Sequence, residues 1–236
     1  MSVTAAVSSI SPKRALFVQF AAVAKAVAHE HRLELLEALA QGERSVELLA
    51  ARTGLSVANA SHHLQQLRRG GVVAARRAGK FVFYSLSDGV VLELLGALQR
   101  IGERNIAEVE SVVNAYFKRR DDLEPVTRDE LLDHMRAGAV TVIDVRPEDE
   151  FALGHLPGSI NIPVGQLKRR LARLDRGKTI VAYCRGAYCV LSFEAVAALR
   201  ARGYDVRRLE DGFPGWRAAG LPVDTGLGRA RTRGSA

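Results

Sequence analysis

Apolar residues recur at helical spacing through the first half of the chain. Four leucines of HRLELLEALAQG place one face of a helix in a core, and Gly42 can end that helix. Ser45 and Ser56 can cap two further helices, of which the second runs to about Arg69, and Gly54 lies between them. The pattern predicts two helices joined by a glycine-containing turn, an arrangement that is typical of DNA reading.

The segment after these helices has the pattern of a hairpin followed by a long apolar helix. VVAARRAGKFVFYSL contains two β-rich runs around a basic turn at residues 77–80, which predicts a wing. Residues 87–117 then carry more apolar side chains than an isolated helix can expose. They need a partner to cover this apolar surface.

The second half of the chain changes to short apolar runs that alternate with helical segments. Residues 139–145 (AVTVIDV) and 179–183 (TIVAY) are suited to buried parallel strands, and stretches such as LKRRLARL separate them. Helical periodicity stops before Pro125, which disfavours helix in the residue that precedes it. The sequence therefore predicts a mainly helical domain followed by an α/β domain with a central parallel sheet.

Composition and charge narrow the functional classes. The chain has 236 residues, of which 47% are hydrophobic and 25% charged, enough for two globular domains. Its net charge of +8 is uneven: 16 Lys and Arg face 10 Asp and Glu through Arg120, against 18 and 16 after it. The basic half is either a solvated surface or a phosphate-binding one. No apolar run reaches the ~20 residues of a membrane span, and the N-terminus lacks the pattern of a signal peptide, so we expect a cytoplasmic protein with no membrane partner.

The segment SVANASHHLQQLRRGGVV and the order of elements around it resemble the ArsR/SmtB family of winged-helix repressors. The resemblance covers about residues 13–117 and implies a homodimer that binds a palindromic operator in double-stranded DNA. It also implies that the long helix over 87–117 packs with the helix at about 13–28 across a two-fold dimer interface. The alternative is that the long helix packs on the second domain, and we favour the dimer because paired half-sites are the usual source of specificity. Leu64 and Leu67 should face the core, while short polar side chains reach base edges and basic ones contact phosphates. The residues expected at the DNA are Ser56, Val57, Asn59, Ser61, His62, Gln65, Arg68, Arg76, Arg77 and Lys80. The alternative for His62 and His63 is a helix surface or a hydrogen bond to the core.

Metal sensing of the kind found in many members of that family is not expected. The helix before the recognition helix reads SVELLAARTG and has no thiol, and no histidine lies between His63 and His134. A soft-metal or zinc site built from those elements lacks its ligands. We predict no metal.

The only two cysteines, Cys184 and Cys189, occupy the loop CRGAYC. Cys184 follows the strand TIVAY, and the ends of parallel strands are where binding sites form. A helix follows the loop, and its N-terminus can lower the pKa of a thiol and stabilise an anion. Two closely spaced thiols in a chain that lacks the pattern of a signal peptide favour reactivity over structural cross-linking.

Three motifs resemble the rhodanese family: DVRPEDEFALGHLPGSINIP, the cysteine loop, and LEDGFPGWRAAGLPV, in which Asp211 stands where a second glycine is common. The resemblance covers about residues 126–224. It implies that the Cys184 thiolate attacks a sulfane-sulfur donor and holds the sulfur as a persulfide, without a metal or organic cofactor. The residues of the implied site are Cys184, Arg185, Gly186, Ala187, Tyr188 and Cys189.

The loop departs from the usual pattern at its end. The fifth and sixth positions after Cys184, where rhodaneses or related phosphatases and arsenate reductases carry arginine, are Cys189 and Val190. Arg185 is the one arginine of the loop, which weakens the case for oxyanion substrates such as thiosulfate, phosphate or arsenate. Cys189 either attacks the persulfide as a resolving thiol or packs into the domain.

Residues Asp144, Arg146 and His155 of the first motif should lie near the site, and a structural role is favoured for them.

Together these features predict a winged-helix domain at 13–118 and a rhodanese-like domain at 126–224, with a linker at 119–125 and disordered tails at 1–12 and 225–236. We expect a transcriptional regulator in which a Cys184 persulfide senses reactive sulfur or redox state. The alternative is a thiosulfate or persulfide sulfurtransferase with an accessory DNA-binding domain. Arsenate or phosphate-ester chemistry ranks last, since the loop lacks the second arginine.

Overall fold

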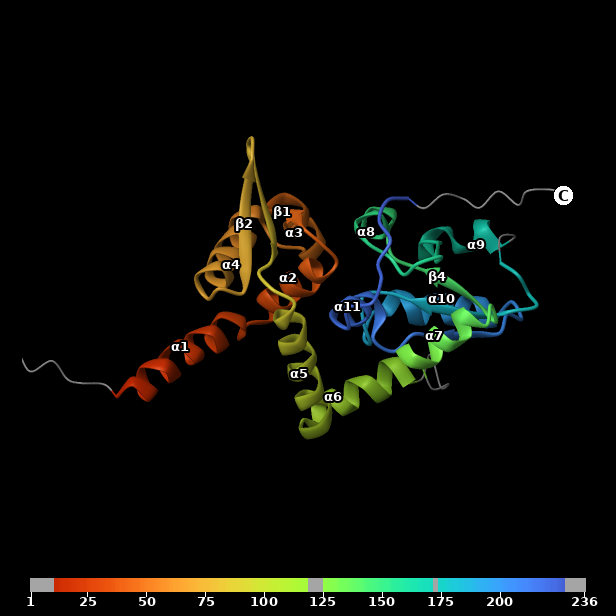
Figure 1. The fold of residues 1–236 in the computed structure, drawn as a ribbon, viewed down its shortest axis with the longest axis horizontal. Coiled ribbons are helices and arrows are strands. Elements are labelled where there is room, and N and C mark those ends of the chain that lie inside the picture. Colours follow the sequence, from red (N-terminus) through yellow and green to blue (C-terminus); the bar gives the residue numbers. More distant parts are fainter. Residues whose placement is uncertain (1–10, 119–124, 172–173, 228–236) are drawn as a thin grey trace, which may run out of the picture. The chain divides into compact units, whose positions relative to one another are not determined.

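The structure, a computed structural model, describes residues 11–118, 125–171 and 174–227 (Figure 1). Most of the expected tails and linker lie outside the described residues. The chain divides into two compact units, and each is described by itself. The first unit comprises the described residues up to Leu39 together with 43–88, and the second comprises 40–42 and the described residues from Gly89 onward.

The first unit has the helices and hairpin that the sequence predicts. The helices are α1 (Pro12–Val27), α2 (Glu30–Ala40), α3 (Val46–Thr53) and α4 (Val57–Arg69). The side chains of Ser45 and Ser56 accept hydrogen bonds from the amides of Leu48 and Asn59, so both predicted N-caps are confirmed. Gly54 ends α3 with φ of 68°, a left-handed conformation that favours glycine.

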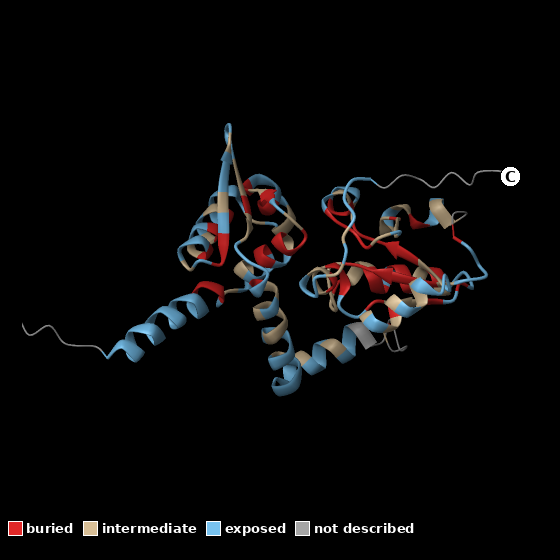
Figure 2. Cartoon of the chain, viewed as in Figure 1, coloured by how far each residue is buried: buried red, intermediate tan, exposed pale blue. Residues whose placement is uncertain are grey.

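The wing is an antiparallel hairpin of β2 (Val73–Ala78) and β3 (Phe81–Leu86). A short strand not expected from the sequence, β1 (Arg44–Ser45), pairs with the other edge of β3. Leu64 and Leu67 of α4 are fully buried, as predicted, while most of α1 is exposed (Figure 2). The first unit is therefore a winged helix-turn-helix with a small antiparallel sheet.

The long helix expected over residues 87–117 is interrupted. It forms α5 (Val90–Asn105), α6 (Ala107–Val112) and the π-helical segment η1 (Val113–Lys118). Ile106 is extended, with φ of −119° and ψ of 107°, and the side chain of Asn105 bonds the carbonyl oxygen of Ile101. The break follows because an extended β-branched residue cannot continue the helix. Helix α5 packs against α11 (Gly212–Ala218) within the second unit, which is the alternative partner considered for it.

The second unit is built on a four-stranded parallel sheet in the order β5-β4-β6-β7. Its strands are β4 (Val140–Asp144), β5 (Ile160–Asn161), β6 (Thr179–Tyr183) and β7 (Val206–Arg208). The helical segments are α7 (Arg128–Arg136), α8 (Glu148–Leu153), η2 (Val164–Gln166), α9 (Leu167–Arg170), α10 (Val190–Arg200) and α11. The predicted α/β class with a parallel sheet is confirmed.

Alternating side chains of the strands give this sheet two cores. Along β6, Ile180 and Ala182 face a cluster that includes Leu199 of α10, whereas Val181 and Tyr183 face one that includes Trp216 of α11. The buried strands are visible in Figure 2. Because β5 and β6 lie on opposite sides of β4, the chain reverses its direction of travel across the sheet between β4 and β6. Asp144 and Tyr183 are register partners at that point, so Cys184 follows the strand end where open sheets form their sites.

Candidate functional site

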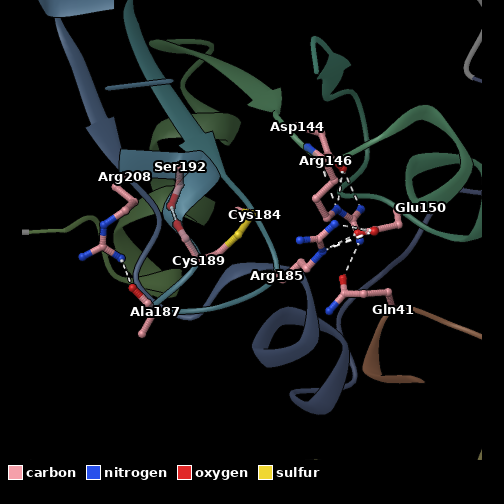
Figure 3. Close-up of a disulfide and its surroundings, with 10 residues drawn as sticks. All are labelled: Gln41, Asp144, Arg146, Glu150, Cys184, Arg185, Ala187, Cys189, Ser192 and Arg208. Carbon is pink, nitrogen blue, oxygen red and sulfur yellow. Dashed lines mark hydrogen bonds and ion pairs between the residues drawn. A yellow bond between two sulfur atoms is a disulfide. The ribbon is translucent and has the colours of Figure 1, made fainter. Parts of the chain in front are cut away.

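The cysteine loop connects β6 to α10. Cys184 is the first residue after β6, Cys189 is the N-cap residue of α10, and a disulfide joins the two across a Cα separation of 6.2 Å (Figure 3). The amide of Cys189 donates to the carbonyl of Gly186 at 3.2 Å, which closes the loop into a compact turn. Both cysteines are buried in the core on the α10 side of the sheet. The structure therefore brings the two thiols of the sequence into one covalent pair.

The closing motif holds the loop from the other side of the strand end. The amide of Phe213 donates to the carbonyl of Cys184 at 2.9 Å. Gly212 has φ of +63°, and a Cβ at this position would lie 2.6 Å from both the Cys184 oxygen and the Gly186 nitrogen. Only glycine fits such an approach of two backbones. Asp211, which replaces the second glycine of the motif, pairs instead with Arg128 of α7 at 3.5 Å.

Arg185 is held by a carboxylate that sequence reasoning did not single out. Its Nε lies 3.2 and 3.0 Å from the two carboxylate oxygens of Glu150, and its Nη2 lies 2.7 Å from Oε1 (Figure 3). The Glu150 side chain is 1% exposed and that of Arg185 is 26% exposed. Nothing in PEDEF distinguishes this buried glutamate from the exposed Glu148, so only the fold reveals the contact.

Two further loop residues bond to side chains outside the loop. The hydroxyl of Tyr188 donates to Oε1 of Glu103 on α5 at 2.5 Å, and desolvation together with this hydrogen bond raises the pKa of Tyr188. Arg208 of β7 donates from Nη1 to the carbonyl of Ala187 at 3.4 Å, and its guanidinium carbon lies 4.3 Å from the centre of the Phe193 ring. The loop is thereby connected to α5 and to the neighbouring strand.

The polar residues of the first motif have structural contacts. Arg146 and Asp144 form a buried bidentate ion pair, and Arg146 Nη2 also donates to the carbonyl of Gly154 at 2.7 Å. His155 stacks on Phe151 with ring centres 3.6 Å apart, and its Nδ1 lies 2.9 Å from the Phe151 carbonyl oxygen. These contacts organise the turn after β4.

In the first unit, α4 presents its polar residues to solvent. Leu64 and Leu67 bury one side of the helix, and the capping residue Ser56 is exposed at its start. Of the side chains expected to reach DNA, Ser61 is half-buried. The exposed ones are Ser56, Val57, Asn59, His62, Gln65 and Arg68 on α4, with Arg76, Arg77 and Lys80 on the wing.

Arg76 of the wing has a partner within the same unit. Its Nη2 and Nε lie 2.6 and 3.2 Å from the two carboxylate oxygens of Glu43. The hydrogen bond from Arg76 lowers the pKa of Glu43, and Glu43 in turn raises the pKa of Arg76. Glu43 therefore occupies two of the nitrogens with which Arg76 could contact a phosphate.

Four of the six histidines gather between the start of α2 and α4. The ring centre of His63 lies 4.6 Å from that of His29 and 5.7 Å from those of His31 and His62. Burial and the neighbouring basic groups, His29 first among them, lower the pKa of His63. Within the residues that the structure describes, no group of three or more His, Cys, Asp or Glu is placed to hold a metal ion.

Comparison with protein families identifies both halves of the chain. Residues 29–75 match the model of the bacterial regulatory protein, arsR family, and residues 127–219 match the rhodanese-like domain. None of the helices in the described ranges has the length and apolar character needed to cross a membrane.

Individual relatives match the whole chain or one half of it. The HTH-type transcriptional regulator Rv0324 of Mycobacterium tuberculosis is 46% identical over 214 residues, which are 91% of this chain and 94% of the relative. A protein of Allochromatium vinosum named sulfurtransferase is 31% identical over 85 residues, 36% of this chain and 78% of its own length. The homodimeric winged helix-turn-helix DNA-binding domain of a possible ArsR-family regulator from Mycobacterium bovis is 38% identical, with a TM-score of 0.39, over 45% of this chain and 94% of that structure.

Proposed function

The chain belongs to the ArsR-family HTH-type transcriptional regulators that carry a C-terminal rhodanese-like domain, and we propose that its cysteine loop senses reactive sulfur and thereby changes operator affinity. The observation that carries the proposal is the bond between Cys184 and Cys189, because it places a second thiol within reach of any sulfur held on the first. A loop with these two thiols can store a chemical signal as a covalent change.

The sulfur chemistry starts from the reduced loop. The Cys184 thiolate attacks the sulfane sulfur of a donor, the sulfur–sulfur bond of the donor breaks, and its leaving group departs with the electron pair. Cys184 then carries a persulfide. The Cys189 thiolate attacks Sγ of Cys184 and expels the outer sulfur as hydrosulfide, which leaves the Cys184–Cys189 disulfide. Two equivalents of a cellular thiol return the loop to its reduced form by successive exchange and leave as their own disulfide.

The DNA-binding part of the proposal rests on α4 and the wing. The exposed polar residues at the start of α4 suit base edges in a major groove, and Arg68, Arg77 and Lys80 suit phosphates. Arg76 joins them when a phosphate displaces Glu43. This arrangement fits sequence-specific binding by one winged helix to one half-site.

A homodimer supplies the second half-site. Leu16, Phe17 and Phe20 of α1 are each more than half exposed, as are Ile101 and Val112 of the later helices. Exposed large apolar side chains that recur along a helix mark protein interfaces. We propose that a second copy covers them, so that the two α4 helices read a palindromic operator.

Operator binding with and without an inorganic polysulfide tests the sensing function. We expect polysulfide to change the operator affinity of the wild-type protein by about tenfold, within the usual range of coupling between sites. Cys184→Ser should abolish the change, and Cys189→Ser should retain a Cys184 persulfide in the mass spectrum without the loop disulfide. An unchanged response in Cys184→Ser would rule out sensing through this loop.

The second candidate function is catalytic sulfur transfer, with the DNA-binding unit as an accessory. It is favoured by the match of residues 127–219, which include Cys184, to the rhodanese-like domain. The discriminating measurement is turnover with a thiol or cyanide acceptor under steady-state conditions. Sustained turnover together with an operator affinity that ignores polysulfide would favour the enzyme over the sensor.

A further inference from the structure

The buried carboxylate of Glu150 is paired with Arg185, the arginine of the cysteine loop that receives the sulfur donor. From the bidentate contact between Glu150 and Arg185, we propose that the loop accepts organic persulfides and polysulfides and rejects thiosulfate, with Glu150 as the specificity-determining residue. The inference deepens the proposed function and rests on it. It names the class of sulfur donor that Cys184 receives.

The position of Glu150 is fixed by the fold. Helix α8 begins directly after Pro147, and the amide of Glu150 donates to the Pro147 carbonyl at 3.1 Å. The side chain is 1% exposed, and a buried carboxylate is strongly unfavourable unless a cation and hydrogen bonds compensate it. Arg185 supplies both, since two of its nitrogens lie within 3.2 Å of the carboxylate oxygens. The positive charge of Arg185 is therefore paired with the carboxylate of Glu150.

A second guanidinium that reaches the loop, that of Arg208, is also directed at protein groups. Arg208 donates to the carbonyl of Ala187 and lies against the face of Phe193, as Figure 3 shows for its contact with Ala187. The last loop position and the next one are Cys189 and Val190, which carry no positive charge. The loop thus presents a donor with less positive charge than its arginine content suggests.

This electrostatic setting discriminates between donors by their leaving groups. Attack of the Cys184 thiolate on thiosulfate breaks the sulfur–sulfur bond and expels sulfite, a dianion whose charge spreads over three oxygens and calls for guanidinium contacts. Attack on the outer sulfur of an organic persulfide breaks the same kind of bond and expels a thiolate, which takes up one proton from water. Its charge rests on one sulfur atom, and no oxyanion has to be stabilised.

The test compares donors on the reduced full-length protein. Persulfidation of Cys184 is followed by mass spectrometry with thiosulfate and with glutathione persulfide as the donor. In the wild type we expect a second-order rate with thiosulfate at least about a hundredfold lower. Glu150→Gln keeps an oxygen that accepts from Arg185 but removes the charge, and should raise the thiosulfate rate about tenfold while the glutathione persulfide rate changes less than threefold.

Matched variants separate this local effect from a general loss of negative charge. Glu148→Gln removes the same charge two residues earlier in α8, from an exposed pair with Arg170, and should leave the thiosulfate rate unchanged. The double variant Glu150→Gln with Arg185→Gln should return the thiosulfate rate to the wild-type level. A gain that persists in the double variant overturns the proposal.

The wild-type comparison keeps the proposal testable if Glu150→Gln fails to fold, because comparable wild-type rates with the two donors also overturn it. Failure of the sensing function has a different signature: the donor preference persists while operator affinity does not respond to either donor.

Discussion

The wing and the cysteine loop each contain an arginine that forms a bidentate ion pair with a glutamate, but the two pairs differ in their exposure to solvent. In the wing, the Arg76 and Glu43 side chains are 59% and 37% exposed. In the loop, the Arg185 and Glu150 side chains are 26% and 1% exposed. Water screens the Arg76–Glu43 pair and can hydrate either side chain if the pair separates. The Glu150 carboxylate is buried, so water cannot take the place of Arg185 as its partner. The same chemistry therefore gives a solvent-exposed ion pair on the wing and a largely buried one in the cysteine loop.

Removing the buried carboxylate should have the largest effect. Glu150→Ala leaves the Arg185 charge near the protein interior without its main partner, and we expect it to lower the free energy of unfolding of the second unit by about 3 kcal/mol. Trp216, the only tryptophan of the chain, is buried in that unit, so its fluorescence during urea denaturation follows that unit.

Glu148→Ala is the matched control, because its pair with Arg170 is more exposed, with side chains 49% and 29% exposed. It should change the same free energy by no more than about 0.5 kcal/mol. Equal losses in the two variants would show that burial does not distinguish the pairs.

The loop also contacts α5, through the hydrogen bond between Tyr188 and Glu103. Covalent continuity joins α5 to β3 of the wing through residues 87–89. If the loop acts on DNA affinity through α5, Tyr188→Phe should reduce the expected tenfold polysulfide response to less than about threefold while Cys184 is still persulfidated at the wild-type rate.

Glu103→Gln retains an oxygen that accepts from the Tyr188 hydroxyl and should preserve most of the response, whereas Glu103→Ala should behave like Tyr188→Phe. A full response in Tyr188→Phe would show that the signal takes another route.

How far the sequence predicts these regions depends on the range of the contacts. The caps at Ser45 and Ser56, the wing and the strands around Cys184 follow from local spacing, and the structure confirms them. The Glu150–Arg185 pair joins residues 35 apart, and Tyr188–Glu103 joins residues 85 apart. No local pattern indicates which glutamate is buried. The break at Ile106 does not follow from the sequence either, because the apolar period continues across it although the backbone there is extended.

The exposed Arg76–Glu43 pair can be tested by measuring DNA binding. Glu43→Gln removes the carboxylate that competes with phosphate for Arg76, so we expect operator affinity to rise about threefold at low salt. If Arg76 gains a phosphate contact, the plot of log affinity against log salt should become steeper by about 0.9.

Glu47→Gln, on α3, removes the same charge without touching the Arg76 contact and is the control. If the salt dependence of operator affinity has the same slope in Glu43→Gln as in the wild type, Glu43 does not control whether Arg76 contacts phosphate.

The smallest expected effect is the dependence of the Arg76–Glu43 pair on pH. Arg76 lowers the pKa of Glu43 in the folded state, mainly through its hydrogen bond to the carboxylate. The stabilisation that the pair provides is therefore complete above the pKa of Glu43 in the unfolded chain, and it is lost as the pH falls through the lower folded value. Carboxyl chemical shifts of Glu43, recorded by NMR against pH, should move to a higher midpoint in Arg76→Gln, while the midpoint of Glu47 stays in place. An unchanged Glu43 midpoint would mean that the pair is absent in solution, and then the contrast between the wing and the cysteine loop would lie in the presence of a pair and not in its burial.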